Sequence, residues 1–271
     1  MSKKASAPIG IFDSGIGGLT VARALKNILP LERIIYFGDT AHLPYGEKST
    51  ASIQAYSIKI ADVLLKAQCK LILIACNSAS AAAFELVKAY VASKAGVFNV
   101  IDPVVNYLRE NHAGHKIGLI GTKQTVNSGA YHQKIDALGE EIELVALATP
   151  LLAPMIEEGF YKNEVSQVII KSYLDHPALQ QLQGLILGCT HYPLIKADIR
   201  EYYGDRVEVI DGSEIVAKAT RSFLELHNLV NISDSGEKDR FLVSDYTPSF
   251  EHATRLFFGK EVNLEKYPLW E

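Results

Sequence analysis

Short, continuously apolar runs recur along the chain, and amphipathic stretches such as TVARALKNIL, ASIQAYSIKIADVLLKAQ and SQVIIKSYLDH lie between them. The runs are PIGIF (8–12), RIIYFG (33–38), LILIA (71–75), VFNVI (97–101), KIGLIG (116–121), IELVALA (142–148), GLILG (184–188) and VEVI (207–210). Strands that are apolar throughout, rather than at alternate positions, are typical of parallel sheets covered by helices on both faces. The amphipathic stretches carry apolar residues at helical spacing. The pattern therefore predicts an α/β fold.

The second half of the chain repeats the order of the first. The runs at 71–75 and 184–188 both end at a cysteine, Cys76 and Cys189. The motifs VIDPV and VIDGS then follow, so we expect Asp102 and Asp211 to begin equivalent helices. Because domains usually have roughly 100–150 residues, two similar α/β domains related by a pseudo-twofold axis explain this order better than one large sheet.

The first of these domains is expected to be discontinuous. It comprises residues 1–100 and about 212–271, and the second domain comprises residues 101–211. The polar stretch NHAGH marks the connection, and FLVSDYTPSFEHATRLFF predicts a strand and a helix that return to the first domain.

The least ordinary loops all follow predicted strands: DSGIGG, GDTAHLPYGEKS, CNSAS, GTKQT and CTHYP. In open parallel sheets, ligands bind beyond the carboxyl ends of the strands. If the two domains face each other, an active site lies in the cleft between them, with Cys76 on one side and Cys189 on the other.

Two facing thiols suit the inversion of a carbon centre, because one group removes a proton and the other delivers one to the opposite face. The pKa of a thiol is about 8.5 and falls near a helix N-terminus or a cation. Cys76 precedes a predicted helix, with Asn77 or Ser78 as its N-cap, so helix N–H groups can favour a thiolate there. His191, two residues after Cys189, could exchange protons with it.

Several blocks together closely resemble the glutamate racemase family: DSGIGGLTV, GDTAHLPYG, CNSA, GTKQTVNSGAY, PMIE and GCTHYPLI, between about residues 9 and 220. The resemblance implies cofactor-independent racemisation of glutamate, which supplies D-glutamate for peptidoglycan, by a homodimer. It implies that Cys76 and Cys189 are the two bases, supported by Asp13, Glu157 and His191. The residues that it assigns to substrate binding are Asp13, Ser14, Tyr45, Gly46, Asn77, Ser78, Thr122, Thr190 and His191. The family usually has threonine where this chain has Ser78; serine keeps the hydroxyl, so we expect binding to survive.

Some of these residues also have ordinary structural interpretations. Asp13 could cap a helix, and Tyr45-Gly46 could be a simple turn. Of Glu157 and Glu158, we expect one to be merely solvated. We interpret Cys69 as structural, because a free cysteine packs as a small hydrophobic residue. The glycines of DSGIGG lack nucleotide-motif spacing, so we expect them to let backbone amides approach a small carboxylate.

Net charge, hydropathy and cysteine spacing argue against several classes of protein. The net charge of −4 and the lack of a basic run argue against a nucleic-acid partner. No apolar stretch approaches the roughly 18 residues of a membrane span, and MSKKASAPIGIF lacks the apolar centre of a signal peptide, so we expect a cytoplasmic protein. The three cysteines have no zinc-site spacing with histidines.

Three other functions compete with glutamate racemisation. Aspartate and hydantoin racemases also use paired cysteines. A two-lobed solute-binding protein would have a similar outline, but it would leave the paired cysteines without a purpose. A cysteine hydrolase could use Cys189 and His191 as nucleophile and base, and it would leave Cys76 idle.

Overall fold

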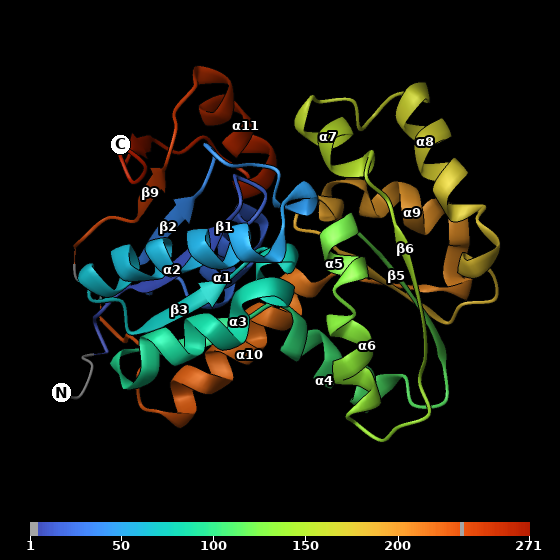
Figure 1. The fold of residues 1–271 in the computed structure, drawn as a ribbon, viewed down its shortest axis with the longest axis horizontal. Helices are drawn as coiled ribbons and strands as arrows, with labels where there is room; N and C mark the ends of the chain where they lie inside the picture. The colour runs from blue at the N-terminus through green and yellow to red at the C-terminus, as the bar shows by residue number, and fades with distance from the viewer. Residues whose placement is uncertain (1–4, 234–235) are drawn as a thin grey trace.

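The computed structural model describes residues 5–233 and 236–271, which form two parallel sheets flanked by helices (Figure 1). One sheet has the strand order β10-β9-β2-β1-β3-β4, and the other has the order β6-β5-β7-β8. All the paired strands run parallel. The predicted α/β fold with two parallel sheets is confirmed.

The strands follow the apolar runs closely. They are β1 (Ile9–Asp13), β2 (Ile34–Gly38), β3 (Leu71–Ile74), β4 (Gly96–Asn99), β5 (Lys116–Gly121), β6 (Glu143–Ala148), β7 (Gly184–Gly188), β8 (Glu208–Ile210), β9 (Arg240–Val243) and β10 (Leu264–Lys266). All residues of β1, β2, β3 and β7 are buried, which is why these strands are apolar throughout.

Helices connect the strands. They are α1 (Leu19–Ile28), α2 (Thr50–Lys66), α3 (Asn77–Val91), α4 (Ile101–Asn111), α5 (Lys123–Asn127), α6 (Ala130–Asp136), α7 (Leu152–Glu157), α8 (Glu164–Leu174), α9 (Lys196–Tyr203), α10 (Gly212–Leu226) and α11 (Pro248–Phe258). Short 3-10 helices lie at Tyr45–Glu47, Ala92–Lys94, Pro177–Leu179, Tyr192–Ile195 and Gly204–Arg206. Among the described residues, no helix has the length and apolarity needed to cross a membrane.

The two sheets share one topology. The order β2-β1-β3-β4 in the first sheet matches β6-β5-β7-β8 in the second, strand for strand. The equivalent strands β3 and β7 lead to Cys76 and Cys189. The duplicated order in the sequence therefore corresponds to a duplicated strand arrangement, which gives the two cysteines equivalent places at the ends of equivalent strands.

The first sheet takes its strands from residues 9–99 and 240–266, and the second from residues 116–210. Helix α4 leads from one sheet to the other, α10 leads back, and these two helices pack against each other. In Figure 1 the blue and red parts of the chain lie together on one side, and the green and yellow parts lie on the other. The domain boundaries themselves stay a prediction.

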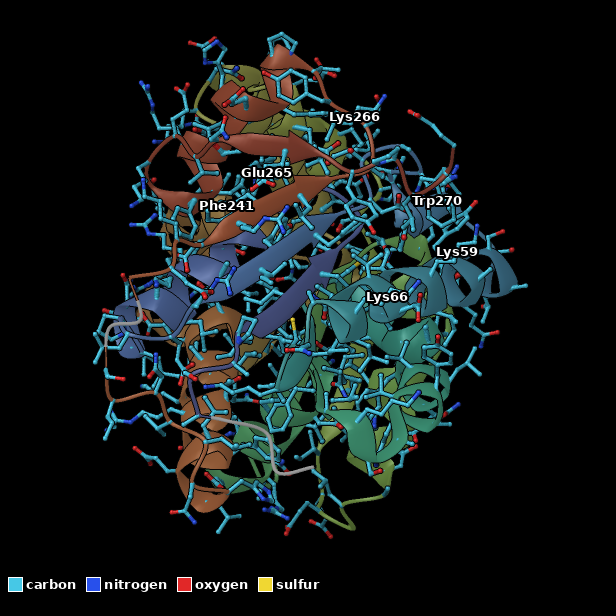
Figure 2. All side chains as sticks on the ribbon, turned by 90° about the vertical axis from the view of Figure 1, so that its left-hand side faces the viewer. Lys59, Lys66, Phe241, Glu265, Lys266 and Trp270 are labelled. Atoms are coloured by element: carbon cyan, nitrogen blue, oxygen red, sulfur yellow. The ribbon has the colours of Figure 1, made fainter. Side chains whose placement is uncertain are left out.

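The structure differs from the sequence expectations at three points. The run at 97–101 ends as a strand at Asn99, because the Asn99 side chain accepts hydrogen bonds of 2.8 Å from the backbone N–H groups of Ile101 and Asp102 and so starts α4. Asp102 thus lies in the first turn of α4, whereas Asp211 is the N-cap of α10. The last segment contributes β9 and α11 as predicted, and also β10, which was not predicted; Figure 2 shows Phe241 of β9 and Glu265 of β10 at this edge.

Candidate active site

A small cavity of about 30 Å³ is lined by the loops that follow strands of both sheets. Its lining residues are Ser14, Pro44, Tyr45, Gly46, Cys76, Asn77, Ser78, Thr122, Ala153, Glu157, Gly188, Cys189, Thr190 and His191. All the site residues predicted from the sequence are in this set except Asp13. Asp13 immediately precedes Ser14 in the chain and is fully buried. The structure brings these residues together, and their chemical roles stay predictions.

Cys76 is itself the N-cap of α3, so the expectation of a cap at Asn77 or Ser78 is wrong. Its Sγ accepts a hydrogen bond of 3.5 Å from the backbone N–H of Ala79, and the thiol lies 3.7 Å from Oγ of Ser14. Burial, together with the charge of Asp13, raises the pKa of Cys76 to about 12. The helix N–H acts in the expected direction, but burial outweighs it.

Asp13 is fully buried beside this thiol. One carboxyl oxygen accepts a hydrogen bond of 3.1 Å from the backbone N–H of Gly15, and the other makes none with the described residues. Burial raises the pKa of Asp13, and the nearby His191 partly opposes that rise. Helix α1 begins at Leu19 without a side-chain cap, so Asp13 does not cap it. A buried carboxyl with an unpartnered oxygen at the site suits proton handling.

Cys189, His191 and Glu157 lie in a row, and each ionisable side chain contacts the next. Its Sγ lies 3.5 Å from Nδ1 of His191, and Nε2 of His191 lies 2.8 Å from Oε1 of Glu157. Burial by itself lowers the pKa of His191, but Cys189 and Glu157 together raise it well above its usual value. The adjacent Glu158 is exposed and is the solvated member of the glutamate pair. Both neighbours of the His191 imidazole thus favour its protonated form, against the effect of burial.

Polar side chains of both halves meet along the cavity wall. The hydroxyl of Ser78, at the start of α3, lies 2.9 Å from the hydroxyl of Thr122, which follows β5. Thr125 lies within 3.3 Å of the Ser78 hydroxyl and 3.1 Å of the Thr122 hydroxyl. The carbonyl oxygen of the Asn77 side chain accepts a hydrogen bond of 2.9 Å from the Tyr131 hydroxyl. Thr125, which supports these two hydroxyls without lining the cavity itself, was not predicted from the sequence, although it lies one helical turn after Thr122.

Tyr45 and Gly46 begin a short 3-10 helix. The Tyr45 hydroxyl donates a 2.7 Å hydrogen bond to the buried Asp39, so its polar group is engaged away from a ligand. At Gly46 a Cβ atom would lie 2.7 Å from Cβ of Thr122, because the two halves of the site approach each other closely here. Gly46 can therefore offer the cavity only backbone atoms, and the one polar group of the Tyr45 side chain is already bonded.

The glycines of DSGIGG border on side chains of the site. A Cβ atom at Gly17 would lie 2.5 Å from Cε1 of His191, and one at Gly18 would lie 2.6 Å from Cβ of Asp13. These glycines leave room for the ionisable groups, a role that the sequence analysis did not assign to them.

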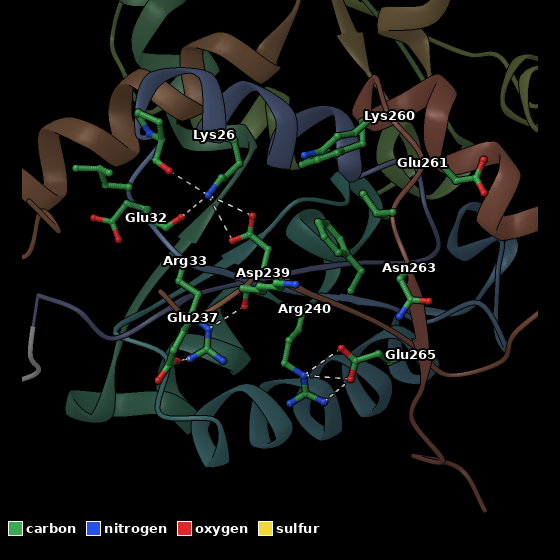
Figure 3. A pocket seen from close by; sticks show the side chains of 16 residues that line it. Lys26, Glu32, Arg33, Glu237, Asp239, Arg240, Lys260, Glu261, Asn263 and Glu265 are labelled. Atoms are coloured by element: carbon green, nitrogen blue, oxygen red, sulfur yellow. Dashed lines mark hydrogen bonds and ion pairs between the residues drawn. The ribbon is translucent and has the colours of Figure 1, made fainter. Parts of the chain in front are cut away.

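A much larger recess lies elsewhere, between the start of β2, β9 and β10, and measures about 750 Å³ (Figure 3). Several of its charged side chains pair with one another, among them Lys26 with Asp239 at 3.2 Å and Arg240 with Glu265 at 2.6 Å. It contains neither cysteine. Its size therefore does not make it the site of the chemistry.

Comparison with known proteins agrees with this geometry. The model of the Asp/Glu/hydantoin racemase family matches residues 19–220. Glutamate racemase of Syntrophus aciditrophicus is 39% identical over 255 residues, which is 94% of both chains. The structure of Francisella tularensis glutamate racemase in complex with D-glutamate superposes with a TM-score of 0.91 at 38% identity, covering 98% of this chain and 99% of that one. The resemblance found in the sequence is confirmed, and the chain belongs to the Asp/Glu/hydantoin racemase family.

Proposed function

We propose that this protein is a glutamate racemase that interconverts L- and D-glutamate. The observation that carries the proposal is a pair of thiols, one after β3 and one after β7, at a single cavity. Relatives named glutamate racemase cover nearly the whole chain. The aspartate racemase of Picrophilus torridus has a TM-score of 0.58 at 18% identity, which supports only a shared fold.

In the proposed reaction, one cysteine as thiolate removes the α-proton of glutamate and leaves a carbanion. The other cysteine then gives its proton to the opposite face, so one Cα–H bond breaks and another forms. Asp13 assists Cys76, and the His191–Glu157 pair assists Cys189. These groups exchange protons with the thiols and restore them for the next turnover.

The remaining polar groups of the cavity hold the substrate. We assign the hydroxyls of Ser14, Ser78, Thr122 and Thr190 and the Asn77 amide to its carboxylates and ammonium, together with the backbone of Tyr45 and Gly46. The cavity of about 30 Å³ has room for little more than water, since one water needs roughly 10–15 Å³. Glutamate therefore enters through a more open arrangement of the two halves.

The family resemblance extends the proposal beyond the site. We propose that the product supplies peptidoglycan synthesis in the cytoplasm, and that the protein is a homodimer. We also propose two domains with boundaries near residues 100 and 212; the origin of the two sheets in separate parts of the chain supports this division. Light scattering on the purified protein measures the oligomeric state directly.

The decisive experiment is proton NMR of L-glutamate in deuterium oxide with the purified protein, alongside optical rotation. We expect the α-proton signal to disappear while the rotation decays to zero. Exchange without loss of rotation would show that only one base works. No exchange with glutamate, but exchange with aspartate, would instead make the protein an aspartate racemase.

The cysteine variants test the two-base mechanism. Cys76→Ser and Cys189→Ser should each nearly abolish racemisation. Each should still eliminate a leaving group from one enantiomer of a suitable substrate, because elimination needs proton removal on one face only. The facing-thiol arrangement is wrong if both variants accept the same enantiomer. A Cys76→Ser protein with full turnover would point to hydrolase chemistry at Cys189.

A further inference from the structure

Asp39 is a buried carboxylate that does not line the cavity but accepts a hydrogen bond from Tyr45, in the turn that contains Tyr45 and Gly46. Asp39 directly follows β2 and is fully buried. Four side chains contact its two oxygens: the Tyr45 hydroxyl at 2.7 Å, the Ser244 hydroxyl at 2.7 Å, the Trp270 indole N–H at 2.8 Å and Nδ1 of His42 at 3.1 Å. A buried carboxylate needs such donors, and hydrogen bonds to a charged acceptor are short and strong. The orientation of Asp39 therefore depends on all of them.

Trp270 reaches Asp39 from the far end of the chain. After β10, the backbone N–H of Tyr267 donates a 2.8 Å hydrogen bond to the carbonyl of Val243, which keeps this segment beside β9. The indole then packs edge-on against His42, with ring centroids 4.5 Å apart. Figure 2 shows Trp270 close to Lys59 of α2, whose Nζ lies 4.8 Å from the ring centroid. The ring is thus wedged between α2 and the loop at 40–47.

The position of this loop affects the cavity directly. Tyr45 and Gly46 line the cavity, and Gly46 lies against Thr122 of the other half with no room for a Cβ atom. A displaced loop would therefore change both the backbone that faces the substrate and the closure of the two halves.

We propose that Trp270 is a positioning residue of the active site: its indole N–H orients Asp39, and Asp39 holds Tyr45 and the loop at 40–47 in the closed geometry. Trp270 itself does not line the cavity, so it acts only through this loop. The proposal rests on the assignment of Tyr45 and Gly46 to the substrate site.

The first test is Trp270→Phe, which keeps an aromatic ring and removes the N–H donor. We expect kcat/KM to fall about ten-fold for both enantiomers, because one hydrogen bond to a charged group is lost. Amide hydrogen exchange at 40–47, measured without substrate, should become faster. Lys266→Ala is the matched control, since Lys266 is exposed and pairs only with Glu271 among the ion pairs described. It should change neither quantity.

A double-mutant cycle with Tyr45→Phe tests whether Trp270 acts on the loop through Asp39 and Tyr45. If Trp270 acts through Asp39 on Tyr45, the Trp270→Phe change costs less in the Tyr45→Phe background than in the parent. The proposal would be overturned if the two substitutions lowered kcat/KM independently, so that their fold-losses multiplied in the double variant. It would also be overturned if Trp270→Phe left amide exchange at 40–47 unchanged or kept kcat/KM within two-fold of the parent. A fully active Tyr45→Phe protein would overturn the proposal as well, because the hydroxyl removed there binds Asp39 and not the substrate. The substrate-free exchange measurement reports on the loop itself, so it separates failure of the Trp270 link from failure of the substrate-site assignment.

The unmodified protein provides an independent test, because Trp270 is its only tryptophan. Glutamate binding that engages the loop should change Trp270 emission, with half-saturation near KM. Emission that is the same with and without saturating glutamate would overturn the proposed link.

Discussion

Replacing Gly17 with alanine tests whether the space beside His191 is required for catalysis. The new Cβ would lie 2.5 Å from Cε1 and 2.7 Å from Nδ1 of His191. Carbon atoms in contact are normally about 3.5–4.0 Å apart, so the imidazole must move by about 1 Å. The loop cannot easily yield, because the Thr20 hydroxyl donates to the carbonyls of both Gly17 and Thr190, at 2.9 and 3.1 Å.

The displaced atom is the one that contacts the thiol, since Nδ1 of His191 lies 3.5 Å from Sγ of Cys189. A misplacement of about 1 Å at a reacting group can cost about 100-fold in rate. We therefore expect kcat/KM of Gly17→Ala to fall about 100-fold, or about 2.7 kcal/mol of activation free energy. The rate is followed by the change in circular dichroism of each glutamate enantiomer, and the thermal midpoint reports whether the fold is intact.

Gly15→Ala is the matched control in the same loop. Its Cβ would meet only Leu43, at the ordinary contact distance of 3.5 Å, so we expect kcat/KM within about three-fold of the parent. If Gly17→Ala keeps more than a third of the parent kcat/KM, the steric reasoning is wrong. Equal losses in both variants would mean that the loop needs glycine flexibility, and not space for His191.

Three further predictions concern other parts of the molecule. Glu157→Gln removes a charge that raises the pKa of His191, so that pKa should fall and the alkaline limb of the pH–kcat/KM profile should move to lower pH; an unmoved limb would exclude His191 as the titrating group. Ser78→Thr keeps the hydroxyl and should retain kcat/KM within about three-fold, whereas Ser78→Ala should lose about ten-fold; equal activities would mean that this hydroxyl does not contact the substrate. Glu32→Ala leaves the buried Lys70 ammonium without its 2.6 Å partner and should reduce the free energy of unfolding by about 3–5 kcal/mol in denaturant titrations; a loss below about 1 kcal/mol would show that Lys70 is neutral in the folded state.

The fold and the pairing of the two cysteines were readable from the sequence because both have local signals, whereas most other residues of the cavity were identified only through the family resemblance. Apolar runs of strand length specify β1, β3 and β7, and the loops after them carry the unusual residues. In contrast, β10 has the sequence LEK, with no strand pattern, and it is a strand only because it pairs with β9. The cap of α3 was misassigned because asparagine and serine are common N-caps, whereas here the Cys76 sulfur accepts the N–H instead.

Asp39 belongs to the motif GDTAHLPYG, but nothing in the sequence predicted its role as a shared hydrogen-bond acceptor. Two of its donors lie 205 and 231 residues away along the chain, at Ser244 and Trp270. Neither motif nor periodicity relates residues that far apart, and only the folded chain brings them to one carboxylate. The pKa of Cys76 was equally out of reach, because burial, and not the helix N–H next to it in sequence, has the larger effect on it.

The two thiols occupy equivalent positions, but their surroundings differ. Thermodynamics limits how this difference can affect kcat and KM in the two directions of the reaction. Burial and the charge of Asp13 raise the pKa of Cys76 to about 12, whereas Cys189 lies 3.5 Å from Nδ1 of a histidine, His191, whose own pKa is raised. Because the equilibrium constant between enantiomers is one, kcat/KM must be the same in both directions. The asymmetry of the site can therefore appear only as a difference in kcat matched by an equal difference in KM, and any variant that lowers kcat/KM must lower it equally for L- and D-glutamate.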